Sequence, residues 1–140
     1  PSPNTLAMRA AVEAGARHNE VDVIVKAPLD AGPDDVLKAN GMILGTTENL
    51  GYMSGALKDF FDRSYYPLWE ETQGLPYTLY IRAGLDGTGT RRSVESIATG
   101  LKWKAVQEPL LCHGEYKERF LVDCRELGTL MAVGLEAGVF

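Results

Sequence analysis

The feature that most constrains the fold is a regular alternation of β-branched segments and amphipathic helical segments. Strand patterns occupy residues 21–26, 41–46, 77–83 and 105–114, and a helical pattern follows each of them. Such alternation requires crossover connections, so the strands pair in parallel and helices cover both faces of the sheet. Because 140 residues suit one domain with one core, the sequence predicts a single α/β domain over residues 1–140.

The first helical pattern, residues 4–18, has no strand before it. A series of alternating strands and helices should begin with a strand, so we expect that a central strand is missing from the sequence. Without it, its two neighbours would each keep a row of unpaired backbone groups, at a cost of about 1 kcal/mol or more for each buried group.

Composition and charge exclude several classes of protein. Fourteen basic residues stand against 19 acidic ones, and the net charge of -5 argues against a nucleic-acid surface. There is no basic run for an anionic membrane, no apolar run long enough to cross a bilayer, and no signal-peptide pattern. We therefore expect a cytoplasmic protein with a small-molecule or protein partner. Cys112 and Cys124 lack CxxC spacing, which favours reduced thiols in or near the core.

The middle of the chain combines a core helix with a candidate ligand loop. Residues 53–63 form one apolar helical stripe, because Met53, Leu57 and Phe60 recur at helical spacing. Residues 46–52, "TTENLGY", have no periodicity and follow the carboxyl end of a strand. Open α/β sheets bind their ligands at that position, so this loop is predicted to form one wall of a binding site.

The first residues, "PSPNT", place hydroxyl, carboxamide and backbone N–H groups at the start of a helix. A helix N-terminus carries about half a positive charge, so this segment has the chemistry of a phosphate cradle. The alternative is that Asn4 or Thr5 only caps the helix. The sequence leaves both interpretations open.

Three motifs together resemble a known family: "SPNT" opening a helix, "GTTENLGYMSGALKDFFDR" in the middle, and "RAGLDGTGT" after the next strand. They resemble the flavodoxin-like, FMN-binding NAD(P)H-dependent oxidoreductases, in particular the tryptophan-repressor-binding-protein quinone reductases and the NADPH-dependent FMN reductases. This resemblance implies a three-layer flavodoxin-like α/β sandwich with a parallel sheet of about five strands in the order 2-1-3-4-5.

The resemblance also implies where FMN binds. It assigns the flavin phosphate to Ser2, Asn4 and Thr5. It assigns the surroundings of the isoalloxazine ring to Thr46, Thr47, Glu48, Asn49, Leu50, Gly51 and Tyr52, and the other edge of the ring to Arg82, Ala83, Gly84, Leu85, Asp86 and Gly87. No catalytic residue is named, because the flavin itself carries the redox chemistry, and no metal site is expected.

The activity implied by the resemblance is hydride transfer from NAD(P)H through FMN to a quinone, a flavin or another small acceptor. The alternative is an FMN electron carrier of the flavodoxin type that docks on a redox protein, but a net charge of -5 is modest for that role and favours the enzyme. The family also implies a homodimer or homotetramer. Residues 64–76 are expected to form a linker whose large apolar side chains help to close a neighbouring subunit's flavin pocket.

Two other readings of the sequence fail on chemistry. The segment "GLDGTG" has glycine spacing G-x-x-G-x-G, whereas a dinucleotide fingerprint requires G-x-G-x-x-G. A phosphoacceptor receiver domain requires an aspartate at the end of the strand at residues 41–46. This chain has Thr46 and Thr47 there instead.

Overall fold

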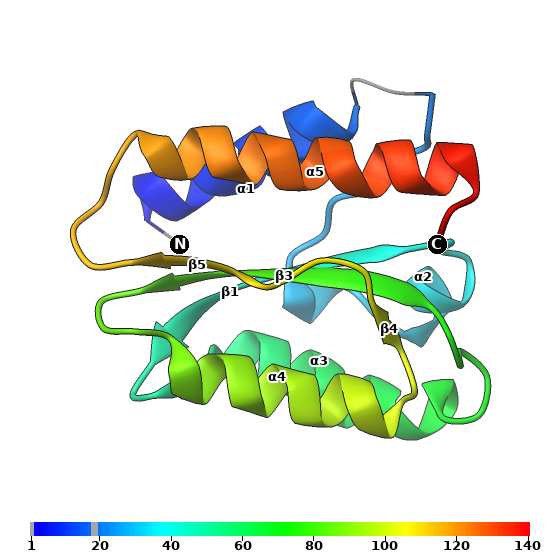
Figure 1. Ribbon diagram of the computed structural model, residues 1–140. Helices are drawn as coiled ribbons and strands as arrows, with labels where there is room; N and C mark the ends of the chain where they lie inside the picture. The colour runs from blue at the N-terminus through cyan, green and yellow to red at the C-terminus, as the bar shows by residue number, and fades with distance from the viewer. Residues whose placement is uncertain (1, 18–19) are drawn as a thin grey trace.

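The fold has three layers, with a central sheet between two pairs of helices. The computed structural model describes residues 2–17 and 20–140. Figure 1 shows α1 (Pro3–Ala16) and α5 (Arg119–Ala137) on one face of the sheet, and α3 (Gly55–Leu68) and α4 (Thr88–Gly100) on the other. The predicted α/β sandwich is therefore confirmed.

The sheet is mostly parallel and is built around one long strand pair. In β1 (Met42–Asn49) and β3 (Pro76–Ala83), the partners run from Met42 opposite Tyr77 to Thr47 opposite Arg82. The interrupted last strand is present as two pieces, β4 (Lys104–Ala105) and β5 (Leu110–His113), which both pair in parallel with β3. The short β2 (Tyr52–Met53) is antiparallel to the end of β1.

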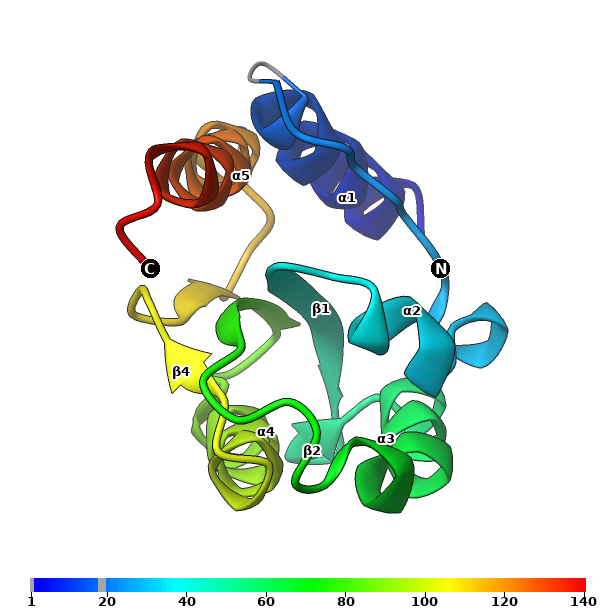
Figure 2. The ribbon, with the colours of Figure 1, turned by 90° about the vertical axis from the view of Figure 1, so that its right-hand side faces the viewer.

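The prediction of a strand at residues 21–26 is wrong for this structure. The segment is extended, but it forms no ladder, and the side chain of Ile24 is 77% exposed. Figure 2 shows the chain passing from the α1 layer to η1 (Pro28–Asp30) and α2 (Pro33–Leu37) without joining the sheet. A β-branched segment becomes a strand only when a neighbour accepts its backbone hydrogen bonds, and no described strand lies between residues 21–26 and β1.

Two predicted helix boundaries also move. The linker expected at residues 64–76 begins later, because α3 continues to Leu68 and buries Ser64 and Leu68 on the same stripe as Phe60. The cap of α1 is Ser2 rather than Asn4 or Thr5, since the Ser2 hydroxyl accepts a hydrogen bond from the Thr5 backbone N–H. In α3, the burial of Ser64 and Leu68 against the rest of the protein extends the helix past its predicted end.

Each face of the sheet has its own apolar cluster. The larger cluster lies toward α3 and α4 and includes Leu44, Phe61 and Ile81. The smaller one lies toward α1 and α5 and includes the free thiols of Cys112 and Cys124, both fully buried. The hydrogen bond between these thiols, together with burial, raises the pKa of Cys124. The prediction that both cysteines lie in or near the core is confirmed.

Helices α1 and α5 approach each other closely at two glycines. A Cβ atom on Gly128 would lie 2.1 Å from the carbonyl oxygen of Val12, and one on Gly15 would lie 2.0 Å from the carbonyl oxygen of Arg125. Contacts this short leave no room for a methyl group, so the spacing of the two helices depends on both glycines.

We predict that Gly128→Ala lowers the free energy of unfolding by about 1–3 kcal/mol, because the new methyl group forces α1 and α5 apart. Urea unfolding followed by far-UV circular dichroism measures the change. Gly55→Ala is the matched control, since Gly55 is also in a helix and a Cβ there would meet nothing within 4 Å. Equal stability of the two variants would contradict the close-packing interpretation.

Candidate functional site

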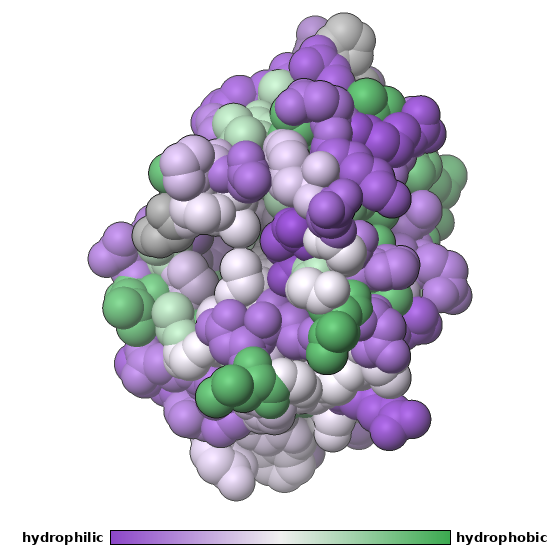
Figure 3. Space-filling view, turned by 90° about the vertical axis from the view of Figure 1, so that its left-hand side faces the viewer, coloured by the Kyte–Doolittle hydropathy of each residue, from purple (hydrophilic) through white to green (hydrophobic). Residues whose placement is uncertain are grey.

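The sequence-predicted site residues collect at one edge of the sheet. The carboxyl ends of β1, β3 and β5 point to the same side of the molecule, and α1 begins on that side as well (Figure 1). Figure 3 looks directly onto this edge, where hydrophobic side chains lie among hydrophilic ones. This is the edge at which open α/β sheets bind ligands.

Two hollows of the surface lie away from this edge. One, of about 550 Å³, lies beside Arg125 and Leu130 on α5, and the other, of about 270 Å³, lies between α2 and residues 71–75. Neither contains a residue that the sequence assigned to the site. Volume alone therefore does not locate the candidate site, which is defined by the chemistry of three loops.

The first loop is the start of α1, where two hydroxyl groups face each other. The Ser2 and Thr5 hydroxyl oxygens are 3.2 Å apart, and the Thr5 hydroxyl donates to the backbone oxygen of Ser2 over 3.0 Å. Asn4 is exposed in the same turn. Pro1 of the predicted cradle lies outside the described residues. The exposed N-terminal turn can present these groups to an anion, while Ser2 also acts as the cap.

The second loop, predicted to be irregular, is a tight hairpin. Strand β1 continues through Glu48 and Asn49, which pair with Met53 and Tyr52 of β2. The residues between the strands, Leu50 and Gly51, both have positive φ angles, +53° and +75°. This is the conformation of a two-residue turn that suits the twist of a hairpin. The sequence missed it because leucine is an unusual residue for the left-handed region.

The base of the hairpin is anchored by threonine hydroxyls. The Thr46 hydroxyl donates to the backbone oxygen of Thr47 over 2.8 Å and accepts from the Ser54 backbone N–H over 3.0 Å. The Thr47 hydroxyl donates to the side-chain oxygen of Asn49 over 3.1 Å. These bonds orient the tip, where Leu50 is fully exposed and Tyr52 is 41% exposed.

The third loop joins β3 to α4 and exposes its backbone. Gly87, with a φ of +75°, is the N-cap of α4, and the exposed Leu85 stands two residues before it. Asp86 accepts a hydrogen bond from the Thr88 backbone N–H over 3.0 Å, and this bond holds the pKa of Asp86 below its ordinary value. Gly84 has open space around its Cα atom, so the backbone there can approach a planar ligand closely.

The side chain of Arg82 points away from the hairpin and from the loop that joins β3 to α4. Its side chain lies on the α5 side of the sheet, with the guanidinium carbon 5.4 Å from the centre of the Phe120 ring and 6.0 Å from that of Tyr116. One guanidinium nitrogen donates to the backbone oxygens of Ala83 and Cys112. Because alternate residues of a strand face opposite sides, Arg82 faces this layer while its neighbour Ala83 is buried against the other.

The hairpin is in direct contact with the first turn of α4, which follows the β3–α4 loop, whereas α1 contributes from a separate element. The backbone oxygen of Gly51 lies so close to Gly89 that a Cβ there would be 2.0 Å away. The buried Thr90 hydroxyl donates to the Glu48 carboxylate over 3.3 Å. Sequence reasoning missed Thr90 and Tyr116. For Thr90, the available signal was a hydroxyl side chain three residues after a glycine N-cap. For Tyr116 there was no such signal, because only the pairing of β3 with β5 brings it to Arg82.

Neither a cluster of metal ligands nor a membrane-spanning helix is found in the described part of the chain. Among residues 2–17 and 20–140, no three histidine, cysteine, aspartate or glutamate side chains are grouped so that they could hold a metal ion. No helix in the same ranges is long and apolar enough to cross a membrane.

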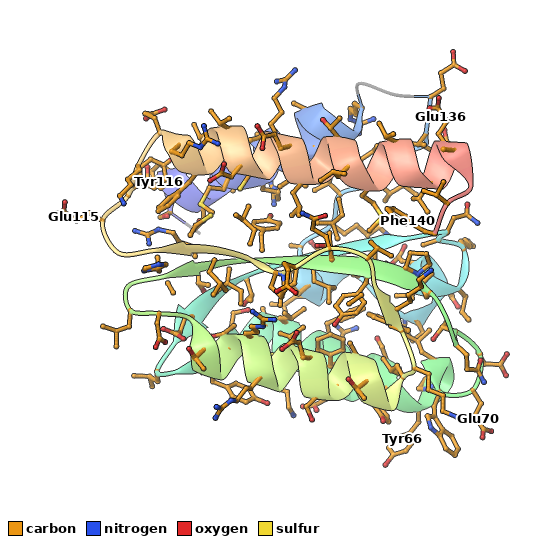
Figure 4. All side chains as sticks on the ribbon, in the orientation of Figure 1. Tyr66, Glu70, Glu115, Tyr116, Glu136 and Phe140 are labelled. Carbon is orange, nitrogen blue, oxygen red and sulfur yellow. The ribbon has the colours of Figure 1, made fainter. Side chains whose placement is uncertain are left out.

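Residues 64–76 do not lie at this edge. Figure 4 shows Tyr66 and Glu70 at the opposite end of the molecule from Glu115 and Tyr116, which follow the carboxyl end of β5. The expected role of this segment in closing the flavin pocket of a neighbouring subunit stays a prediction, because such a contact would come from another copy of the chain. Self-association of the chain stays a prediction, and light scattering at micromolar concentration tests it.

No model of a known protein family matches the chain. A curated protein named flavodoxin, from Aquifex aeolicus strain VF5, is 35% identical over 99 residues, which are 70% of this chain and 54% of that protein. The chain thus spans about half the length of this relative.

Solved structures share the fold. An archaeal flavodoxin superimposes with a TM-score of 0.83 at 20% identity and covers 97% of this chain and 93% of its own. The flavodoxin of Megasphaera elsdenii gives 0.78 at 19% identity, with 95% and 93% covered. A WrbA-like flavodoxin from Agrobacterium tumefaciens gives 0.73 at 22% identity, with 92% and 87% covered. The chain therefore has the flavodoxin-like fold.

The comparisons correct the predicted activity. The sequence relative is named flavodoxin, which favours an electron carrier over an NAD(P)H-dependent quinone or flavin reductase. The enzyme interpretation depended on the "MSGALKDFFDR" segment, and the structure explains why that segment misled. It forms the start of α3, where Leu57, Phe60 and Phe61 pack against the sheet. A motif that serves the core of the fold does not specify the electron donor.

We predict that Leu50→Asn raises the free energy of unfolding of the flavin-free protein by about 1 kcal/mol, because asparagine tolerates a positive φ better than leucine. Leu50 is fully exposed, so its removal costs little packing. Leu85→Asn is the matched control, since Leu85 is exposed on the other loop and is absent from the positive-φ residues. Thermal and urea unfolding measure both variants, and a gain shared by both would contradict a conformational origin.

Proposed function

We propose that this chain binds FMN at the carboxyl edge of its sheet and carries electrons to a redox protein. The observation that carries the proposal is the contact between Gly51 and Gly89, which holds the hairpin against the first turn of α4, directly after the β3–α4 loop and on the side where α1 begins. The 35% identity to a protein named flavodoxin supports the same assignment.

The start of α1 has the chemistry to hold the flavin phosphate. The hydroxyls of Ser2 and Thr5 bond to each other and to their own turn, so each can turn toward an incoming anion. The helix dipole adds a positive potential at this end, and no lysine or arginine is needed for binding. Asn4, exposed in the same turn, adds a carboxamide donor.

The two ring loops provide apolar side chains and backbone groups. Leu50 and Tyr52 project from one loop and Leu85 from the other, which suits the faces of a flat aromatic ring. Gly84, which is exposed and has open space beside its Cα atom, keeps the backbone accessible on the second loop. Bound there, FMN would supply reversible one- and two-electron chemistry, so the protein needs to bind and orient it rather than provide an acid or base.

The exposed apolar tips also suit docking of a protein partner. Leu50 and Leu85 would border the flavin and exclude water from a contact with another redox protein. The net charge of -5 attracts a basic partner at long range and speeds the encounter at low salt.

We predict that Thr5→Ala weakens FMN binding about tenfold or more, because one hydrogen bond to a dianionic phosphate is lost. Fluorescence titration of FMN measures the change. Riboflavin, which lacks the phosphate, should bind the unaltered protein far more weakly and should be nearly indifferent to Thr5→Ala.

Thr99→Ala is the control variant, since Thr99 is exposed near the end of α4 and should leave both affinities unchanged. Equal affinity of the unaltered protein for FMN and riboflavin would contradict the phosphate cradle. Failure of both flavins to bind would contradict the proposed function.

A second prediction concerns the electron donor. In the absence of oxygen, NADPH alone should not bleach the visible absorption of the FMN-loaded protein within minutes, whereas dithionite should, because a carrier accepts electrons from a reductase rather than from NADPH. Catalytic bleaching by NADPH without an added reductase would contradict the carrier role.

A further inference from the structure

The hairpin that carries Leu50 is held against the first turn of α4 at two points. At the tip, the backbone oxygen of Gly51 rests on Gly89, where a Cβ would come within 2.0 Å of it. At the base, the Thr90 hydroxyl donates to the Glu48 carboxylate over 3.3 Å. The hairpin is therefore joined to the helix turn that directly follows the β3–α4 loop.

The surroundings of Glu48 show what the second contact supplies. Thr90 is fully buried, while Glu48 is half-buried and forms no ion pair among the described residues. Helix α4 has no acidic residue in its own first turn, and its N-cap is Gly87, but the Asp86 carboxylate just before it accepts from the Thr88 backbone N–H. Glu48 adds a second negative charge, from the hairpin, near the positive end of α4.

We propose that Glu48 is a positioning residue, which holds the hairpin to α4 through Thr90 and keeps the two ring loops at a constant separation in the flavin-free protein. This role rests on the proposed flavin function. A loop that is already ordered loses less conformational entropy when a ligand binds, so the contact raises affinity for the flavin ring. It acts on the ring alone, because the phosphate cradle is on α1.

The experiment compares Thr90→Val, which removes the hydroxyl at nearly constant volume, with Thr90→Ser, which keeps it. Amide hydrogen exchange of Leu50 to Met53 in the flavin-free protein is the first measurement. We expect exchange about three- to tenfold faster in Thr90→Val and in Glu48→Ala, with nearly unaltered exchange in Thr90→Ser. Thr99→Val makes the same substitution at an exposed site of α4 and should change nothing.

The second measurement is the affinity of each variant for FMN and for riboflavin. Both flavins should bind Thr90→Val about three- to tenfold more weakly, by the same factor, because they share the ring. Unchanged exchange in Thr90→Val and Glu48→Ala would overturn the proposal, as would a loss confined to FMN. If the unaltered protein binds neither flavin, the proposed function fails, and the exchange measurement still decides whether Glu48 holds the hairpin.

Discussion

The parallel pairing of β1 with β3 is the interaction on which the rest of the structure depends. It brings Thr47 opposite Arg82, so that the two strands end side by side and release their loops at the same edge. It also separates the two apolar clusters, because alternate residues of each strand face opposite helix layers. A shift of one residue in this register would turn Leu79 and Ile81 away from α3 and α4.

The candidate site follows from what happens after the strands end. Each of the two loops has hydrogen bonds of its own, since Thr46 holds the base of the hairpin and Asp86 accepts from the Thr88 backbone N–H at the start of α4. The hairpin and the first turn of α4 also support each other, because the Gly51 oxygen lies on Gly89 and Thr90 bonds to Glu48. An exposed leucine held in a costly conformation is typical of a functional position.

The sequence predicted much of the fold because hydrophobic periodicity reports burial directly. It located the strands at residues 77–83 and 105–114 and the helix that begins near Pro33. It was wrong where pairing decides the outcome: residues 21–26 have strand composition but no described partner, and residues 46–52 looked irregular although Thr46 and Thr47 pair with β3 and the residues after them form a hairpin. The sequence also could not give the direction of the Arg82 side chain, which depends on its place in β3.

The sequence by itself determined the α/β class, the ligand edge and the loops that meet there, because local patterns of apolar residues and glycines suffice for these features. Tertiary structure alone decided that Glu48 meets Thr90 and that α1 approaches α5 through Gly15 and Gly128. Residues 42 positions apart come within hydrogen-bond distance only after the β1–β3 pairing and the crossover through α3 have placed their elements. No local pattern records such a distance, because it is a property of the packed chain.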